Sequence, residues 1–334
     1  MPWALHFADF GQLACAGLCG PEELSLLSLL SGNEESGYCS CKVNENAIDR
    51  SHCRGGKVKG FFSAAGLVLA MTAALAMAAP AQTSYSVVTV GDGGTITGTV
   101  KWSGPRPKPL LFPITKDVNV CDPDNAKTRD LERLEIGANG GVANTVVYLA
   151  NIDHGKAWDL PAARRSLNQK RCRYEPHIFL VPQGSALNMM SSDAVLHNIH
   201  MTGASSYNMA FVKTNQVSSE TLSDPGLIDV QCNGGHAWMN AEVLVVRHPY
   251  YAVTDENGRF TLANVPPGQY QIVAWHEGWQ IAGKESKIDV FTQSHMEHLH
   301  YSEPETWKKS VTVQPNNSAQ VDFEISDHSD HSGM

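Results

Sequence analysis

Short runs in which apolar and polar residues alternate fill the chain from residue 94 onward. Their apolar positions are rich in β-branched residues, and Gly, Pro, Asn and Asp separate one run from the next. This pattern is typical of an all-β sandwich or barrel, because side chains alternate between the two faces of a strand and turn formers end each run. The runs are TITGTVKW, GGVANTVVYLAN, HIFLVPQGSALNMM, VLHNIHM, LIDVQC and AEVLVVRH. Helical periodicity is clearest in KTRDLERLEI, residues 127–136, where we expect one short helix.

The pattern becomes more regular after His248. A tight hairpin signal at residues 255–258 and a second turn signal at residues 265–268 divide segments that alternate at period two. Further strands are expected near residues 287–291 and 320–325. This part resembles the carboxypeptidase regulatory-like, or transthyretin-like, domain, which is a small β-sandwich. The resemblance covers residues 249–325 and implies a domain boundary at residue 248.

The first 81 residues differ from the rest of the chain. A short basic start, an apolar run over residues 61–79 and small residues before Gln82 resemble a secretory signal at residues 58–81. Because a signal belongs at a terminus, residues 1–57 are interpreted as an upstream extension from a misassigned start, with translation beginning at Val58. The competing interpretation is a retained membrane anchor, but Ala, Gly, Ser and Thr make the run only weakly hydrophobic. We therefore expect export to the periplasm or the extracellular space, with no membrane span after cleavage.

Charge and cysteine content narrow the chemistry of the exported part. The net charge of −9 comes without a cluster of Lys and Arg, so a nucleic-acid partner is disfavoured. Three cysteines follow residue 81, and an odd number in an oxidising compartment predicts one disulfide and one cysteine kept for another purpose. Cys121 and Cys172 both lie in polar, turn-like surroundings and are predicted to pair. Cys232 is then the free cysteine.

The free cysteine belongs to the stretch QCNGGHAWMN, which also holds His236 and Met239. A thiolate, two imidazoles and a weak axial thioether form the ligand set of blue-copper electron-transfer sites. The missing imidazole must come from a distant segment, and the strand-like run VLHNIHM offers His197 and His200. Side chains alternate along a strand, so only one of these two histidines can face the loop. The alternative is a metal-free turn that holds a buried cysteine.

The order of these residues resembles the cupredoxins, which are Greek-key β-sandwiches. In that family a Cys ends one strand, a His and a Met follow on a short loop, and Asn commonly follows the first His. The resemblance implies a cupredoxin-like domain over residues 82–248 and one type 1-like copper ion. It assigns the ligands as His197, Cys232, His236 and Met239, with Asn198 joining the two ligand loops from outside the ligand set. Ile228 stands where a dinuclear centre needs a second Cys, so one copper is expected.

The two resemblances together cover residues 94–325. Their combination is similar to bacterial exported proteins that are loosely labelled methylamine-utilisation proteins. The shared segments include RYEPH, residues 173–177, and HPYY, residues 248–251. The pairing supports an architecture of two β-sandwiches and adds little about the physiological role.

We expect an electron carrier and not an enzyme. Cys232 lacks the flanking histidines of multicopper oxidases, and Gln280 occupies the place where an HExxH motif needs its second His. His236 is predicted to lie at an exposed edge as the exit for the electron. Ala237 and Trp238 would form part of the docking face for a redox partner such as a periplasmic cytochrome or dehydrogenase. Two alternatives stay open: a copper carrier or sensor without a redox role, and a metal-free two-domain binding module.

The other histidines are given structural or solvated roles. His177 and His276 are predicted to be structural. The histidine-bearing segment at residues 294–300 and the polar tail at residues 326–334 can collect metal ions, but they are interpreted as solvated because nothing fixes their geometry.

Overall fold

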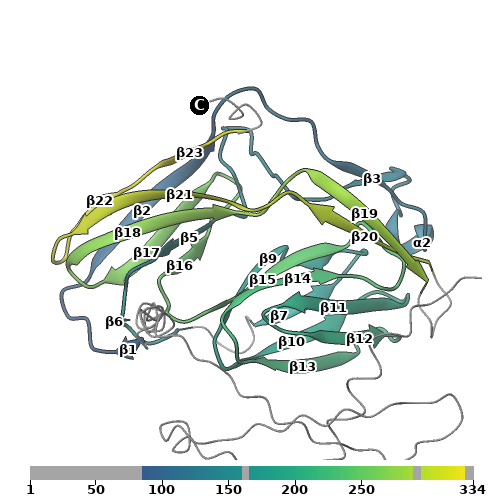
Figure 1. The fold of residues 1–334 in the computed structure, drawn as a ribbon, viewed down its shortest axis with the longest axis horizontal. Helices are drawn as coiled ribbons and strands as arrows, with labels where there is room; N and C mark the ends of the chain where they lie inside the picture. Colours follow the sequence, from purple (N-terminus) through teal and green to yellow (C-terminus); the bar gives the residue numbers. More distant parts are fainter. Residues whose placement is uncertain (1–84, 160–164, 289–294, 328–334) are drawn as a thin grey trace, which may run out of the picture. The chain divides into compact units, whose positions relative to one another are not determined.

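The computed structural model describes residues 85–159, 165–288 and 295–327 (Figure 1). Within these ranges the regular elements are strands, apart from the short helix α2 (Val118–Cys121). The all-β sandwich class predicted from the alternating pattern is therefore confirmed. The predicted signal at residues 58–81, the extension at residues 1–57 and the tail from residue 328 lie outside the described residues.

One sandwich is built from consecutive strands between residues 166 and 246. Its two sheets have the strand orders β13-β10-β7-β8 and β12-β11-β14-β15-β9. Apolar side chains from both sheets share one buried core, which includes Leu187 and Met189 from one sheet and Ile199 and Val230 from the other. We call this unit the inserted sandwich. Its strands are β7 (Ser166–Gln169), β8 (Tyr174–Glu175), β9 (Ile178–Pro182), β10 (Ser185–Ser191), β11 (His197–Gly203), β12 (Tyr207–Phe211), β13 (Val217–Leu222), β14 (Gly226–Gln231) and β15 (Asn240–Val246).

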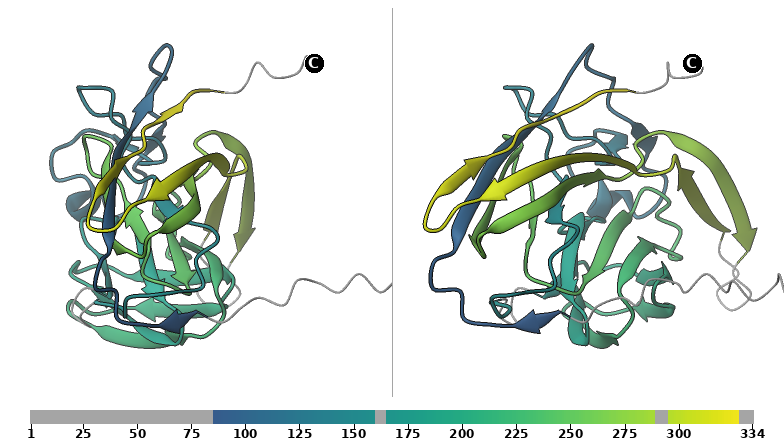
Figure 2. Two further views of the ribbon diagram at one scale, coloured as in Figure 1. Left: turned by 90° about the vertical axis from the view of Figure 1, so that its left-hand side faces the viewer. Right: turned by 60° about the vertical axis from the view of Figure 1, so that its left-hand side comes forward.

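The second sandwich takes its strands from both ends of the described chain, and we call it the split sandwich. One sheet has the order β16-β5-β18-β21, and the other has the order β17-β2-β22 with β23 also paired to β2. Figures 1 and 2 show β2 beside the C-terminal strands β22 and β23 in every view. The strands are β2 (Gly94–Trp102), β5 (Val146–Leu149), β16 (Tyr251–Val253), β17 (Arg259–Val265), β18 (Gly268–His276), β21 (Glu305–Val313), β22 (Ser318–Gln320) and β23 (Phe323–Ile325).

The sheets do not follow the domain boundary expected at residue 248. β2 and β5 precede the inserted sandwich in sequence, yet β2 pairs with β17 and β5 pairs with β18. The inserted sandwich thus occupies the connection between β5 and β16. The alternating pattern identified the strands, but it carries no information about which strand pairs with which.

The predicted turn at residues 255–258 forms, whereas the predicted helix at residues 127–136 does not. The turn at residues 255–258 forms, with the Gly258 amide donating to the Asp255 carbonyl at 2.8 Å. It is not a hairpin, because β16 and β17 belong to different sheets. The helix predicted at residues 127–136 was wrong. There the chain forms β4 (Thr128–Asp130), paired with β3 (Leu111–Pro113), and Glu132 has a φ of 62°, which interrupts a helix.

A long two-stranded ribbon links the sandwiches. It consists of β19 (Ile281–Ile288) and β20 (His295–Tyr301), and Glu285 pairs with His298 in its register. Leu299 is 1% exposed and belongs to the core of the inserted sandwich, and its carbonyl accepts a hydrogen bond from Gln231. Residues 295–300 are therefore part of a strand in which Leu299 is packed and His300 is exposed, so their interpretation as a solvated segment holds only in part. A short parallel pair, β1 (Ser86–Val87) and β6 (His154–Gly155), precedes the inserted sandwich.

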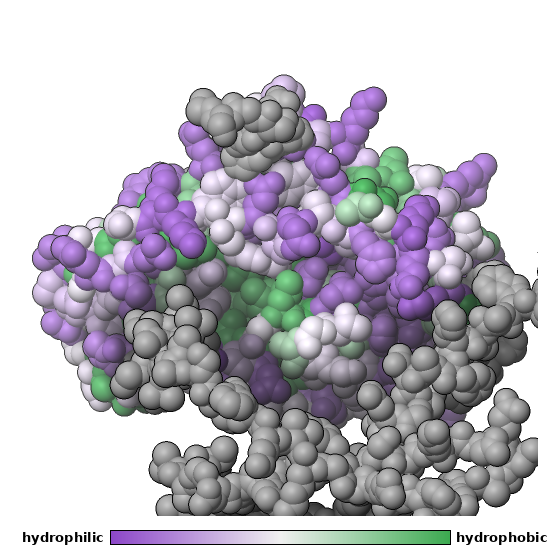
Figure 3. All heavy atoms as spheres, in the orientation of Figure 1, coloured by the Kyte–Doolittle hydropathy of each residue, from purple (hydrophilic) through white to green (hydrophobic). Residues whose placement is uncertain are grey.

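The surface is chiefly polar on the face drawn in Figure 3, where hydrophobic atoms appear in smaller areas. Among the described residues, no helix combines the length and the apolar character that a bilayer crossing needs.

Candidate metal centre

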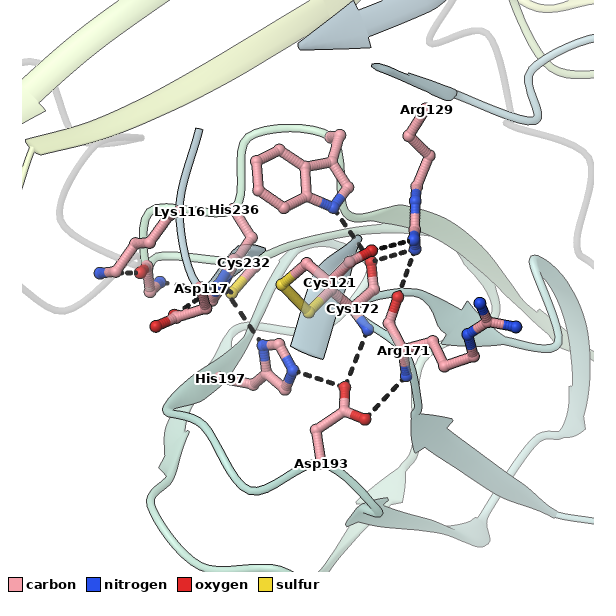
Figure 4. Close-up of a disulfide and its surroundings, with 12 residues drawn as sticks. Lys116, Asp117, Cys121, Arg129, Arg171, Cys172, Asp193, His197, Cys232 and His236 are labelled. Carbon is pink, nitrogen blue, oxygen red and sulfur yellow. Dashed lines mark hydrogen bonds and ion pairs between the residues drawn. A yellow bond between two sulfur atoms is a disulfide. The ribbon is translucent and has the colours of Figure 1, made fainter. Parts of the chain in front are cut away.

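Three of the predicted ligands meet inside the inserted sandwich (Figure 4). The donor atoms of His197, Cys232 and His236 all lie within 4.8 Å of one another. The two Nδ1 atoms of the histidines are 3.3 Å apart, and the Cys232 Sγ atom is 3.7 Å from the His236 Nδ1 atom. None of the three residues is more than 1% exposed. A soft thiolate and two imidazoles thus converge on one enclosed point.

Strand pairing explains why residues distant in sequence meet here. β11 begins at His197, and Cys232 follows the last residue of β14. These strands are antiparallel neighbours in which His200 pairs with Gln231, so the start of β11 lies beside the chain that leaves β14. The loop of residues 232–239 then carries the cysteine and His236 back toward β15.

The two glycines of QCNGGHAWMN have separate roles. A Cβ atom on Gly234 would lie only 3.1 Å from the Cys232 Sγ atom and 3.1 Å from the Leu196 carbonyl oxygen, so a side chain there would crowd the site. The Gly234 amide also donates a hydrogen bond to that sulfur at 3.3 Å. Gly235 has a φ of 87°, in the left-handed region that favours glycine. The tight turn between the cysteine and His236 therefore depends on both glycines.

Each histidine is held from behind by a carboxylate. The Nε2 atom of His197 lies 2.8 Å from Asp193, and the Nε2 atom of His236 lies 2.9 Å from Asp117. A carboxylate at Nε2 fixes the proton there and leaves Nδ1 free to bind a metal ion, which is the usual arrangement around metal-binding imidazoles. Both Nδ1 atoms face Cys232 or each other, as metal binding requires.

The predicted disulfide between Cys121 and Cys172 is present and adjoins this cluster. Cys121 is the last residue of α2, whose N-cap is Asp117. At the other end of the bridge, the Cys172 amide donates to the Asp193 carboxylate at 2.8 Å. The sulfur atoms lie within 4.8 Å of a His236 ring nitrogen. One covalent bridge thus links the segment that carries Asp117 to the backbone that Asp193 binds.

Two further side chains fix the backbone on either side of the disulfide. The Arg129 guanidinium donates to the carbonyl oxygens of Cys121 and Cys172. The Trp238 indole donates to the Cys172 carbonyl at 3.1 Å. The loop that carries the predicted ligands is thereby tied to the disulfide.

The buried thiol and imidazole shift one another's pKa values. Burial raises the pKa of the Cys232 thiol, but hydrogen bonds and charge from His197 and His236 outweigh this effect and lower it to about 5. Burial lowers the pKa of His197, but the hydrogen bonds to Asp193 and Cys232 raise it to about 9. The cysteine is therefore a thiolate at neutral pH, which is the form that binds metal ions.

Met239 and Asn198 lie where the loop meets the rest of the site. Met239 is 1% exposed, and its amide donates to the His236 carbonyl at 2.9 Å. The Asn198 side-chain oxygen accepts a hydrogen bond from the Asn233 amide at 3.4 Å, which joins β11 to the loop after Cys232. That contact is of the kind expected for Asn198.

The prediction that His236 lies at an exposed edge was wrong. His236 is fully buried, because the segment with Asp117 covers its Nε2 edge. Trp238 is 3% exposed and packs against the ring of His236, with ring centroids 5.3 Å apart. Trp238 is therefore a packing residue and not part of an exposed docking face.

The two carboxylates were not predicted from the sequence. Asp193 stands four residues before His197, a spacing that gives a weak signal of a local contact, whereas Asp117 lies 119 residues before His236 and gives none. His200, on the opposite face of β11, stacks on His298 instead of joining the cluster.

His177 and His276 lie outside this cluster. His177 bonds to Glu277 at 2.5 Å and is buried. His276 is also buried, and its Nδ1 atom lies 2.8 Å from the Glu277 carbonyl. Both contacts fit the structural roles that we predicted.

Comparison with known proteins gives one family match. Residues 230–326 match the carboxypeptidase regulatory-like domain. The match begins within β14 and leaves out β2 and β5, although these two strands complete the sheets of the split sandwich. No curated protein matches the chain.

Several solved copper proteins resemble part of the chain. A purple cupredoxin from Nitrosopumilus maritimus is 18% identical, with 24% of this chain and 98% of that chain covered and a TM-score of 0.22. A copper-containing nitrite reductase from Thermus scotoductus is 13% identical, with 30% and 25% covered and a TM-score of 0.24. A mutant of amicyanin in its Cu(I) form is 21% identical, with 26% and 87% covered and a TM-score of 0.23. At these TM-scores the likenesses carry no argument about this chain.

Proposed function

We propose that this chain is an exported mononuclear copper protein that transfers single electrons. The observation that carries the proposal is the convergence of His197, Cys232 and His236, with both Nδ1 atoms and the sulfur turned to one enclosed point. In this proposal Met239 is the weak axial ligand. Bound copper supplies the one-electron couple, and the chain supplies the ligands, their orientation and the exclusion of water.

The donor atoms fit copper better than the hard divalent ions. Magnesium and calcium prefer oxygen ligands, whereas a thiolate and imidazoles suit copper and zinc. A rigid ligand set also suits electron transfer, because the site then changes little between the two oxidation states. Here the rigidity comes from the carboxylates Asp117 and Asp193 and from the disulfide, which links the segment of Asp117 to the backbone that Asp193 binds.

The wider setting is part of the same proposal. We infer a cupredoxin-like sandwich inserted into a regulatory-like one. The pairing of these two domain types resembles the exported bacterial proteins loosely labelled methylamine-utilisation proteins. The chain would act outside the cytoplasm as a carrier and not as an enzyme. Its partner would be a redox protein such as a periplasmic cytochrome or dehydrogenase.

The thiolate assignment is tested by adding Cu(II) to the purified protein and recording visible absorption. An intense thiolate-to-copper band is expected at one equivalent of copper. Cys232→Ser should remove this band, and His200→Gln is the matched control because His200 lies outside the cluster. A band of the same intensity in Cys232→Ser would rule out the proposed site.

A second candidate is a protein that holds copper without transferring electrons. The full burial of His236 favours it, because an enclosed site retains its ion and leaves no edge of the His236 ring exposed to a redox partner. Repeated oxidation and reduction of the copper-loaded protein separates the two functions. A carrier cycles between states with small redox reagents, whereas a holding protein keeps one oxidation state.

A further inference from the structure

The burial of His236 raises the question of how an electron reaches the surface, and the answer rests on the proposed function. Both histidines of the cluster are fully buried, and a carboxylate covers each Nε2 atom. Trp238 and Met239 are buried as well. The remaining ligand is Cys232, so the residue that follows it in the chain is of special interest.

That residue, Asn233, is partly exposed and is held at both its backbone and its side chain. Its amide donates to the Asn198 side chain at 3.4 Å. Its side-chain oxygen accepts a hydrogen bond from the Nε2 atom of His298 at 2.6 Å. The ribbon contributes His298 through β20, so this bond links the chain next to the thiolate with the ribbon.

His298 lies at the surface end of this connection. It is partly exposed and stacks on His200, with ring centroids 5.7 Å apart and an angle of 26° between the rings. His200 is partly exposed too, and its ring projects from the face of β11 opposite to His197. The two imidazoles therefore form a polar, accessible contact for a redox reagent.

We propose that electrons enter and leave the copper site through Cys232, Asn233 and His298. The route runs through covalent bonds from the Cys232 sulfur along the backbone and the Asn233 side chain, then through one short hydrogen bond to the imidazole ring of His298. Electron tunnelling is more efficient through covalent and hydrogen bonds than across empty gaps of equal length. In the oxidising direction one electron passes from the site to a one-electron acceptor, and no proton or atom is transferred.

A competing route leads through Leu196, which precedes His197 and is 37% exposed. Its aliphatic side chain provides no polar contact for a reagent. This route starts from an imidazole, whereas the thiolate shares more electron density with copper. The two routes involve different residues and are separated by mutation.

The test is stopped-flow oxidation of the copper(I)-loaded protein by hexacyanoferrate(III), which is reduced to hexacyanoferrate(II). His298→Phe keeps a ring against His200 but removes the donor to Asn233. Its rate should fall by about tenfold, equivalent to about 1.4 kcal/mol in the barrier. His298→Gln restores a donor and should restore the rate. His300→Phe, two residues along β20 and exposed, is the matched control and should leave the rate unchanged.

Absorption and reduction potential are measured on every variant and should match those of the unmodified protein, because His298 is not a ligand. An unchanged rate in His298→Phe would overturn the proposed route. So would a rate that falls in Leu196→Ala while His298→Phe stays fast. The visible absorption of the copper-loaded, unmodified protein is recorded before any rate is measured. Absence of the intense band there would contradict the proposed function and not the proposed route.

Discussion

Removal of the Cys121–Cys172 disulfide should weaken both the fold and the copper site. The perturbation is the double variant Cys121→Ser with Cys172→Ser, with the two cysteines changed to Ala as a second version that buries no hydroxyl groups. The bridge spans a sequence separation of 51 residues. For a closed loop of this length the loss of chain entropy in the unfolded state corresponds to about 4 kcal/mol.

Urea unfolding of the metal-free protein measures this effect directly. The free energy of unfolding should fall by about 4 kcal/mol in both versions. The dependence on urea should become steeper, because the unfolded chain exposes more surface without the bridge. A loss smaller than about 1 kcal/mol would refute the idea that the disulfide restrains the unfolded chain.

Copper binding provides the second half of this prediction. The bridge joins the segment of Asp117 to Cys172, whose amide binds Asp193, so its removal should loosen both carboxylates behind the histidines. Loss of such contacts lowers metal affinity by about 10- to 100-fold. A competing chelator should therefore remove copper from the double variant at a lower concentration than from the unmodified protein. Equal affinities in a folded double variant would show that the bridge does not support the site.

Two further variants test single contacts. Asp117→Ala removes the carboxylate behind His236 and should lower copper affinity by about tenfold while the intense band remains, whereas the exposed Asp124→Ala should leave affinity unchanged; chelator competition measures both. Burial lowers the pKa of His248 from 6.5 to about 4. Between these pH values the unfolded chain binds a proton that the folded chain does not, so the free energy of unfolding decreases as the pH is lowered. The free energy of unfolding should drop by about 2 kcal/mol more in the unmodified protein than in His248→Gln between pH 7 and pH 5. Equal pH dependence in the two proteins would contradict the burial of a neutral His248.

The strands were readable from the sequence because alternation at period two is a local property. Their partners were not, because pairing between β2 and β17 depends on contacts across more than 150 residues of chain. The same limit applies to the turn at residues 255–258, which formed as predicted but joins strands of different sheets. A sandwich split by an insertion looks, in sequence, like two sandwiches in a row.

The residues of the candidate site were accessible to sequence reasoning, but their surroundings were not. Cys232, His236 and Met239 share one loop with a recognisable spacing, and the pair His197–Asn198 gave the distant partner. Asp117 lies on a segment with no such spacing, and only the fold brings it to His236. The mistaken prediction of an exposed His236 followed from this, because a covering segment leaves no mark in the sequence of the site.

The most direct test of the copper assignment is the electron paramagnetic resonance spectrum of the purified protein, recorded with visible absorption as Cu(II) is added. One equivalent should give an intense thiolate-to-copper band and the resonance of a single copper ion with strong thiolate character. A colourless protein whose copper resonance is that of nitrogen and oxygen ligands alone would contradict the account. The loop QCNGGHAWMN would then be a tight turn that buries a cysteine.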